Sequence, residues 1–298
     1  MPRFVASSLP ASSLLASSLL ASSLPALFAL FGCGGNFQPY SHIAALSVLA
    51  IKAEPPELAP GETTTLTAEA FDPEGRAITL QWAACLDPPS PTTGDVVNPD
   101  CLTTTTADYL LPLGTGISVP FTMPAIDPKT LGTPDVTSGL YLPVRVLISA
   151  GDSHITAVYR LRFSLFPPPN QNPRIDEILL LPDGISGSEG GSLSDGEPID
   201  AGRPVSFRAL LHPGSAETYK VITFDQNKQP VVSTQTEELR VSWFSTQGTF
   251  TNEHTGEARP DTTLTVAVGT PPGPLELWAA VGDGRGGEDF LHRSLVIR

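Results

Sequence analysis

The chain is poor in basic residues. Its 298 residues include 17 Lys and Arg against 31 Asp and Glu, which gives a formal net charge of −14 at pH 7. No local cluster of basic side chains offsets this excess of acid. Nucleic-acid phosphates attract clustered Lys and Arg, whereas an acidic protein repels them. We therefore expect no binding to nucleic acid.

The sequence also lacks the common catalytic motifs. It contains no G-x-S-x-G, H-E-x-x-H, C-x-x-C or Walker pattern, and its five histidines are scattered. The glycine-rich stretch 184–202 has acidic residues and no lysine, so it does not suit a phosphate, and we expect a mobile loop there. These absences favour a protein that is not an enzyme. An enzyme whose site no motif reveals is an alternative.

Cysteine is scarce, with three residues in the whole chain. Cys33 follows an apolar leader, whereas Cys85 and Cys101 lie in a segment rich in Pro and Thr. In an exported chain the oxidising environment favours a disulfide between Cys85 and Cys101, and two free buried thiols are the alternative. The chain-entropy model assigns a loop of this size about 3 kcal/mol of stabilisation.

What the sequence does have at its start is the composition of an export signal. Four Ser-Ser-Leu-(Pro or Leu)-Ala units fill 7–26, an apolar run follows at 27–31, and Arg3 is the only charged side chain of 1–32. A positive end, an apolar middle and a small residue at the end are features of a secretory signal. The apolar region is longer than usual, so an uncleaved membrane helix is the alternative. Its eight serines and two prolines argue against that helix.

The end of this leader resembles the lipoprotein signal peptides of bacteria. Leu30, Gly32 and Cys33 match the pattern of an apolar residue, a small residue and the acylated cysteine, although Phe31 is bulkier than usual. The resemblance implies removal of 1–32 and acylation of Cys33. Gly34 after the cysteine implies sorting to the outer membrane. The protein is thus expected to be a lipoprotein of the bacterial cell envelope, held to the membrane by its lipid anchor.

A tether at 33–45 is followed by the period-two alternation of apolar residues that is typical of β-strands. The first module, 46–166, contains a Pro- and Thr-rich insertion at 87–139, and Trp82 is its expected core aromatic. Pro120 restricts one strand to a sheet edge. The expected strands are 46–51, 63–71, 78–84, 117–121, 142–148 and 157–163.

The second module, 174–298, repeats the order of the first. A proline-rich linker at 167–173 separates the two, and we expect it to be a stiff spacer. In both modules a long alternating strand runs into a Gly-Asp turn, at 151–152 and 282–283, and a terminal strand follows. The sequence therefore predicts an all-β chain of two tandem immunoglobulin-like β-sandwiches after a signal peptide. The expected strands are 175–181, 204–211, 239–243, 262–268, 275–281 and 290–297.

Two turns, FDPEG at 71–75 and AVGDGRGG at 280–287, resemble those of PKD-like and cadherin-like modules of bacterial surface proteins. The resemblance concerns fold far more than activity. Some cadherin-like modules bind calcium at their ends, so calcium is the one cofactor considered. Carboxylates that serve only local turns are the alternative, because no dense D-x-D-x-D pattern is present. The candidate ligands are Asp72, Glu74, Asp152, Asp283, Glu288 and Asp289.

Together these features predict a non-enzymatic envelope protein whose modules mediate binding or adhesion. The expected partner is another envelope protein or a polysaccharide. A passive spacer or structural subunit is the alternative. Recognition is expected at 87–139 and 184–202, the least scaffold-like parts. Trp278, on the strand face opposite Leu277 and Ala279, is the candidate exposed aromatic for a carbohydrate.

Overall fold

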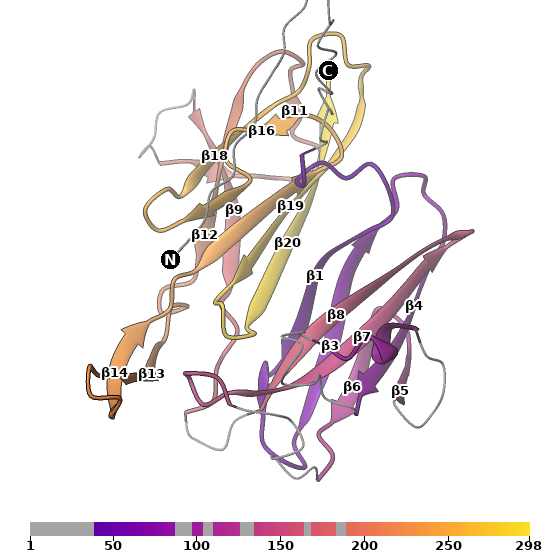
Figure 1. The fold of residues 1–298 in the computed structure, drawn as a ribbon. Coiled ribbons are helices and arrows are strands. Elements are labelled where there is room, and N and C mark those ends of the chain that lie inside the picture. Colours follow the sequence, from indigo (N-terminus) through magenta and orange to yellow (C-terminus); the bar gives the residue numbers. More distant parts are fainter. Residues whose placement is uncertain (1–38, 87–96, 104–109, 126–133, 164–167, 183–188) are drawn as a thin grey trace, which may run out of the picture. The chain divides into compact units, whose positions relative to one another are not determined.

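The computed structural model describes residues 39–86, 97–103, 110–125, 134–163, 168–182 and 189–298. Residues 38–298 form one compact unit, and two β-sandwiches with separate cores lie within it (Figure 1). The leader and Cys33 lie outside the described residues, so cleavage and acylation stay predictions. In the described ranges, no helix is long and apolar enough to cross a membrane.

The first sandwich packs the three-stranded sheet β1-β3-β6 against the five-stranded sheet β2-β8-β7-β4-β5. Alternate residues of each strand point into its core, and Trp82 fills the centre with its Nε1 donating to the carbonyl of Gly116 at 2.8 Å. Pro120 lies on the edge strand, as predicted. The elements are β1 (Ser47–Glu54), β2 (Glu57–Leu58), β3 (Thr63–Phe71), β4 (Ile78–Cys85), α1 (Asp100–Thr103), β5 (Leu110–Thr115), β6 (Ser118–Thr122), β7 (Leu140–Ala150) and β8 (Ser153–Phe163).

The second sandwich packs two five-stranded sheets, β10-β9-β12-β18-β16 and β11-β20-β19-β15-β17. Trp243 is buried between them and its Nε1 donates to Thr255 Oγ1 at 2.9 Å. The strands are β9 (Ile175–Leu181), β10 (Gly191–Ser192), β11 (Pro198–Ile199), β12 (Val205–Leu211), β13 (Thr218–Phe224), β14 (Pro230–Thr236), β15 (Arg240–Ser245), β16 (Thr249–Phe250), β17 (His254–Gly256), β18 (Asp261–Thr265), β19 (Gly273–Gly282) and β20 (Glu288–Ile297).

The two sandwiches share one connection plan. In each, the tryptophan-bearing strand, β4 or β15, pairs with the first strand of the last hairpin, β7–β8 or β19–β20. In each, a two-residue strand, β2 or β11, pairs in parallel with the final strand. This confirms the prediction of an all-β chain built from two tandem immunoglobulin-like β-sandwiches.

Some local expectations need correction. Neither β5 nor the hairpin β13–β14 was predicted, and the strand expected at 262–268 ends at Thr265, beyond which Val268 is exposed. The described part of the expected mobile loop, 189–202, is not a free loop. Buried Leu193 and Ile199 hold it in the core of the second sandwich, and β10 and β11 pair with β9 and β20.

The linker does not act as a free spacer between the sandwiches. Asn170 is buried; its amide N–H donates to Glu57 Oε2 at 2.9 Å and its Nδ2 donates to Asp283 Oδ2 at 2.7 Å. A Cβ on Gly287 would lie 2.8 Å from the carbonyl oxygen of Gln171, so the close approach of linker and β19–β20 turn requires glycine there. The linker is thus bonded to both sandwiches.

An apolar cluster joins the outer faces of the two sandwiches. Trp278 of β19 is only 1% exposed, its ring lies 4.9 Å from that of Phe71, and its Nε1 donates to Glu69 Oε1 at 2.9 Å. Trp278 does lie on the predicted face of its strand. The expectation that it is an exposed aromatic is wrong, because the first sandwich covers that face. The cluster comprises Ile43, Leu49, Phe71, Phe244, Trp278 and Ala280.

Candidate functional site

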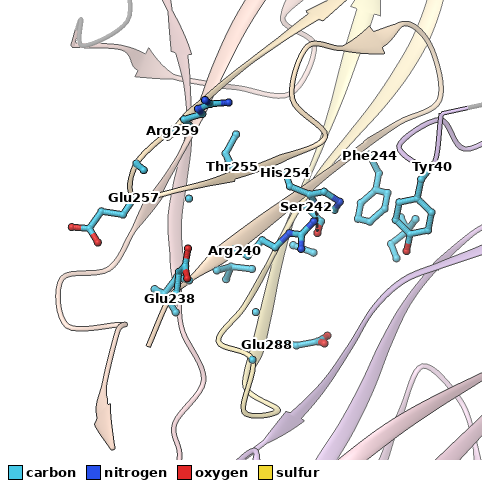
Figure 2. A pocket seen from close by; sticks show the side chains of 18 residues that line it. Tyr40, Glu238, Arg240, Ser242, Phe244, His254, Thr255, Glu257, Arg259 and Glu288 are labelled. Carbon is cyan, nitrogen blue, oxygen red and sulfur yellow. Dashed lines mark hydrogen bonds between the residues drawn. The ribbon is translucent and has the colours of Figure 1, made fainter. Parts of the chain in front are cut away.

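An open cleft lies beside this apolar cluster, on the outer face of β15, β17 and β19. Its volume is about 1180 Å³ (Figure 2). Leu49 of β1 and Tyr40, which precedes β1, add to its wall. The packing of the first sandwich on the second therefore forms part of the cleft.

Cross-strand pairing explains the hollow floor of the cleft. Arg240 lies opposite Gly282 and Gly256, and Ser242 lies opposite Ala280 and His254. Because successive residues of a strand point to opposite faces, Val241 and Trp243 fill the core while their neighbours face the cleft. Small residues beside Arg240 and Ser242 leave space above the sheet.

One end of the cleft is aromatic. Tyr40 is 69% exposed, and its ring lies 5.7 Å from that of Phe244, tilted by 60°. Phe244 is itself buried in the cluster between the sandwiches, so Tyr40 rests on a fixed neighbour. Figure 2 shows the two rings side by side. An exposed ring with a fixed support is a surface on which an apolar ligand face can pack.

The rest of the cleft carries polar side chains beside apolar ones such as Leu239 and Val281. Ser242 Oγ lies 3.1 Å from His254 Nδ1, and desolvation followed by the charge of Arg240 lowers the pKa of His254. Exposed Glu238 and Arg240 supply a carboxylate and a guanidinium, and Figure 2 labels both among the lining side chains. These groups offer several hydrogen-bond donors and acceptors to a polar ligand.

A second carboxylate closes the cleft toward the first sandwich. Glu288 accepts the N–H of Ile51 at 3.2 Å, and burial raises the pKa of Glu288 to about 7. Its neighbour Asp289 accepts the N–H of Ile175 at 2.9 Å and pairs with Lys52 at 3.0 Å. Both carboxylates therefore hold the sandwiches together at the border of the cleft.

The Ser242–His254 pair bears on the enzyme alternative. In serine hydrolases the second imidazole nitrogen is held by an acid and oxyanion donors stand nearby. Here Nδ1 faces the serine, and no hydrogen bond to Nε2 is made by a residue that the structure describes. Both residues lie on paired strands rather than at a sharp turn or helix N-terminus. The geometry suits binding better than acyl transfer.

The two candidate calcium ligands at 72–74 both contact the side chain of one arginine. Asp72 is buried and accepts hydrogen bonds from Arg76 N and Nε at 2.9 Å and from Nη2 at 2.7 Å. Glu74 lies 3.3 Å from the same guanidinium. The hydrogen bond from the Arg76 side chain is the main cause that lowers the pKa of Asp72. These carboxylates therefore serve the local turn, which is the alternative to calcium binding.

Asp152 is exposed in the turn between β7 and β8, whereas the other three candidates bond to protein groups. Asp283 accepts the N–H groups of Arg285 and Gly287 and Nδ2 of Asn170, while Glu288 and Asp289 bond across to β1 and β9. Among residues with described positions, no three His, Cys, Asp or Glu side chains form a group that could hold a metal. Calcium stays a prediction, and an ion would have to displace these bonds.

Cys85 and Cys101 do come together. Both are buried in a small cluster with Ala83 and Leu110, where α1 carries Cys101 to the end of β4. The structure contains both as thiols, with a side-chain hydrogen bond between them, and burial is the main cause that raises the pKa of Cys85. The disulfide itself stays a prediction, with its two residues placed side by side.

Sequence reasoning missed the residues of the cleft. Tyr40 is far from Arg240 and His254 in the chain, and the three share no motif. The period-two pattern assigns Arg240 and Ser242 to the outer face of their strand, but only strand pairing brings His254 beside them. The signal in the sequence that bears on the cleft is therefore the strand alternation, which gives the outward face of Arg240 and Ser242.

No protein-family model matches the chain, and no curated protein matches it either. Among solved structures it is similar to the D0-D1 domain of intimin, with 15% identity over 83% of this chain and 98% of that one and a TM-score of 0.21. It is also similar to the N-terminal Ig1-2 module of the Drosophila receptor protein tyrosine phosphatase DLAR, with 10% identity over 85% of this chain and 99% of that one and a TM-score of 0.25. A third similarity is to extracellular cadherin domains 3-6 of protocadherin gamma B2, with 14% identity over 85% of this chain and 51% of that one and a TM-score of 0.21. These similarities carry no argument about function.

Proposed function

We propose that the protein is a non-enzymatic, lipid-anchored binding protein of the bacterial cell envelope and that the cleft on β15, β17 and β19 is its ligand site. The observation that carries this proposal is the combination of an exposed, supported Tyr40 ring with Arg240, Ser242 and His254 around one open cleft. An open cleft admits a chain that extends beyond it at either end.

The lining supports an envelope polysaccharide as the ligand. A sugar ring has one apolar face, which can pack on Tyr40, and a rim of hydroxyls, which can bond to Glu238, Arg240 and Ser242. The acidic chain repels strongly anionic polymers, so a neutral or cationic polysaccharide is favoured.

Binding of purified protein to isolated envelope polysaccharides, measured by pull-down and calorimetric titration, tests the ligand site. We expect Tyr40→Ala and Arg240→Ala each to weaken binding by about tenfold or more, as for central anchor residues. Ile117→Ser is the matched control, because Ile117 is similarly exposed on the first sandwich away from the cleft. Equal binding by Tyr40→Ala and the control would refute the assignment of the cleft.

The lipid anchor has a separate test. Its support is the leader and the position of Cys33 after it. We expect Cys33→Ser to move the protein from the membrane fraction to the soluble fraction, because the acyl chains supply the membrane affinity. Unchanged membrane retention of the variant would contradict the proposal.

The Ser242–His254 contact makes a hydrolase the second candidate. A fluorophosphonate probe distinguishes the two, since it labels an activated serine and not a merely hydrogen-bonded one. We expect no labelling of the native protein. Labelling that disappears in Ser242→Ala would overturn the non-enzymatic proposal.

A further inference from the structure

The hairpin β13–β14 carries an open strand edge. Its ends are fixed by the bond from Asp225 N–H to Gln229 O and by that from Glu237 N–H to Glu217 O, each 2.9 Å. In an antiparallel pair, residues alternate between bonding to the partner strand and pointing their N–H and C=O groups away. The register therefore directs the backbone N–H and C=O groups of Val231, Ser233 and Gln235 of β14 toward β13. It directs the backbone groups of Val232, Thr234 and Thr236 outward.

The two edges of the hairpin differ. On β13 the same alternation points the backbone N–H and C=O groups of Ile222 away from β14. Its N–H donates to Val136 O of the first sandwich at 2.7 Å. On β14 no described residue forms a backbone hydrogen bond to the outward groups of Val232, Thr234 or Thr236. Figure 1 draws β14 as the outer strand of this hairpin, at the lower left.

The other sheet edges of the described structure are blocked. Five of them are strands of two or three residues, namely β2, β10, β11, β16 and β17. β6 contains Pro120, and β5 contains Pro112 and pairs with β4 across a bulge. β1 is bonded to Glu288 and Asn172. Natural proteins protect exposed edges with such devices, and β14 lacks them apart from Pro230 at its first position.

We propose that β14 pairs antiparallel with β14 of a second copy, which makes a four-stranded sheet across a two-fold axis. An antiparallel edge is self-complementary, since each outward residue offers one N–H and one C=O. β14 has no charged residue, so the pairing sets no like charges opposite one another, whereas most of this acidic chain repels its own copies. Exposed Phe224, Val231 and Val232 lie beside the edge and lose water-accessible apolar surface on pairing.

One register overlaps the whole strand. With the axis at Ser233, Val232 of one copy lies opposite Thr234 of the other and Pro230 lies opposite Thr236. The outward N–H groups of Val232, Thr234 and Thr236 then all find acceptors. The two Ser233 residues form a non-hydrogen-bonded pair, in which the Cβ atoms are close enough for a disulfide.

Sedimentation velocity of the full chain with Cys33→Ser, which removes lipid-driven association, tests the proposal. We expect a weak, concentration-dependent dimer, because one strand pair buries less than the ~1,200 Å² of a stable interface. Thr234→Pro removes an outward donor from each copy and should weaken dimerisation by about tenfold or more. Val232→Lys places a charge at the same edge and should act in the same direction; Val232 is 63% exposed, so folding is spared.

Cross-linking fixes the register. In the same background we expect Ser233→Cys to form a disulfide-linked dimer under mild oxidation. Thr223→Cys, which is on β13, is the control and should stay monomeric. A monomer at every concentration, or equal cross-linking of both variants, would overturn the proposal. So would loss of the dimer in Phe224→Lys but not in Thr234→Pro, since that result assigns the contact to the apolar tip.

Discussion

At the scale of single residues, buried charges hold the two sandwiches together. Arg162 and Glu57 form a fully buried ion pair at 2.9 Å, and Asn170 links Glu57 to Asp283 of the second sandwich. Arg285 donates to Glu237 at 2.8 Å nearby. Removing one partner of such a pair leaves an uncompensated buried charge, so each of these residues depends on the others.

The Glu288 carboxyl makes stability depend on pH. Burial raises its pKa from 4.5 to about 7 in the folded protein, so folding takes up a proton between these values. Its contribution to stability is therefore complete below pH 4.5 and is lost as the pH rises to about 7. We expect Glu288→Gln, which keeps an acceptor for Ile51, to flatten this decline in denaturant unfolding measured at pH 5, 6, 7 and 8.

The control for this prediction is Glu74→Gln, because Glu74 is exposed in a turn and its side chain lies 69% open to solvent. This variant should keep the slope of the native protein. A Glu288→Gln protein whose stability changes with pH as steeply as that of the native chain would show that the buried carboxyl does not titrate in this range.

At the scale of elements, α1 places Cys101 beside Cys85 at the end of β4. A disulfide between these two residues would fix α1 to β4. If the predicted disulfide forms in the exported protein, the native chain unfolded without reductant will take up no alkylating reagent at these residues, and mass spectrometry after reduction will show two added labels. Cys101→Ser should then destabilise the fold by about 3 kcal/mol. Two labels before reduction would establish free thiols instead.

Strand alternation made most elements of the core predictable from sequence. Trp82 and Trp243 mark inward faces, and their neighbours repeat every second residue. The hairpin β13–β14 was missed although Val231 and Val232 are β-branched, because its strands are mostly exposed and lack a clear apolar face. Trp278 shows another limit of strand alternation as a predictor. Alternation assigns Trp278 to the outer face of its strand but does not reveal that the first sandwich covers that face.

At the scale of the whole molecule, the contacts between the sandwiches create the proposed site. Leu49 of the first sandwich belongs to the apolar cluster and also lines the cleft, together with Tyr40. No sequence pattern reveals this, because the cleft needs two modules that each look complete alone. The compact unit of 38–298 therefore differs from two modules joined by a stiff spacer.

Scanning calorimetry of the folded chain tests this coupling most directly. We expect one cooperative unfolding transition for both sandwiches, because they share buried bonds and an apolar cluster. Leu49→Asp places a charge in that cluster without touching the core of either sandwich, and it should split the transition in two, whereas Ile117→Asp on the exposed surface should not. Two separate transitions in the native protein would show that the sandwiches unfold independently and that the contacts between them do not couple the two.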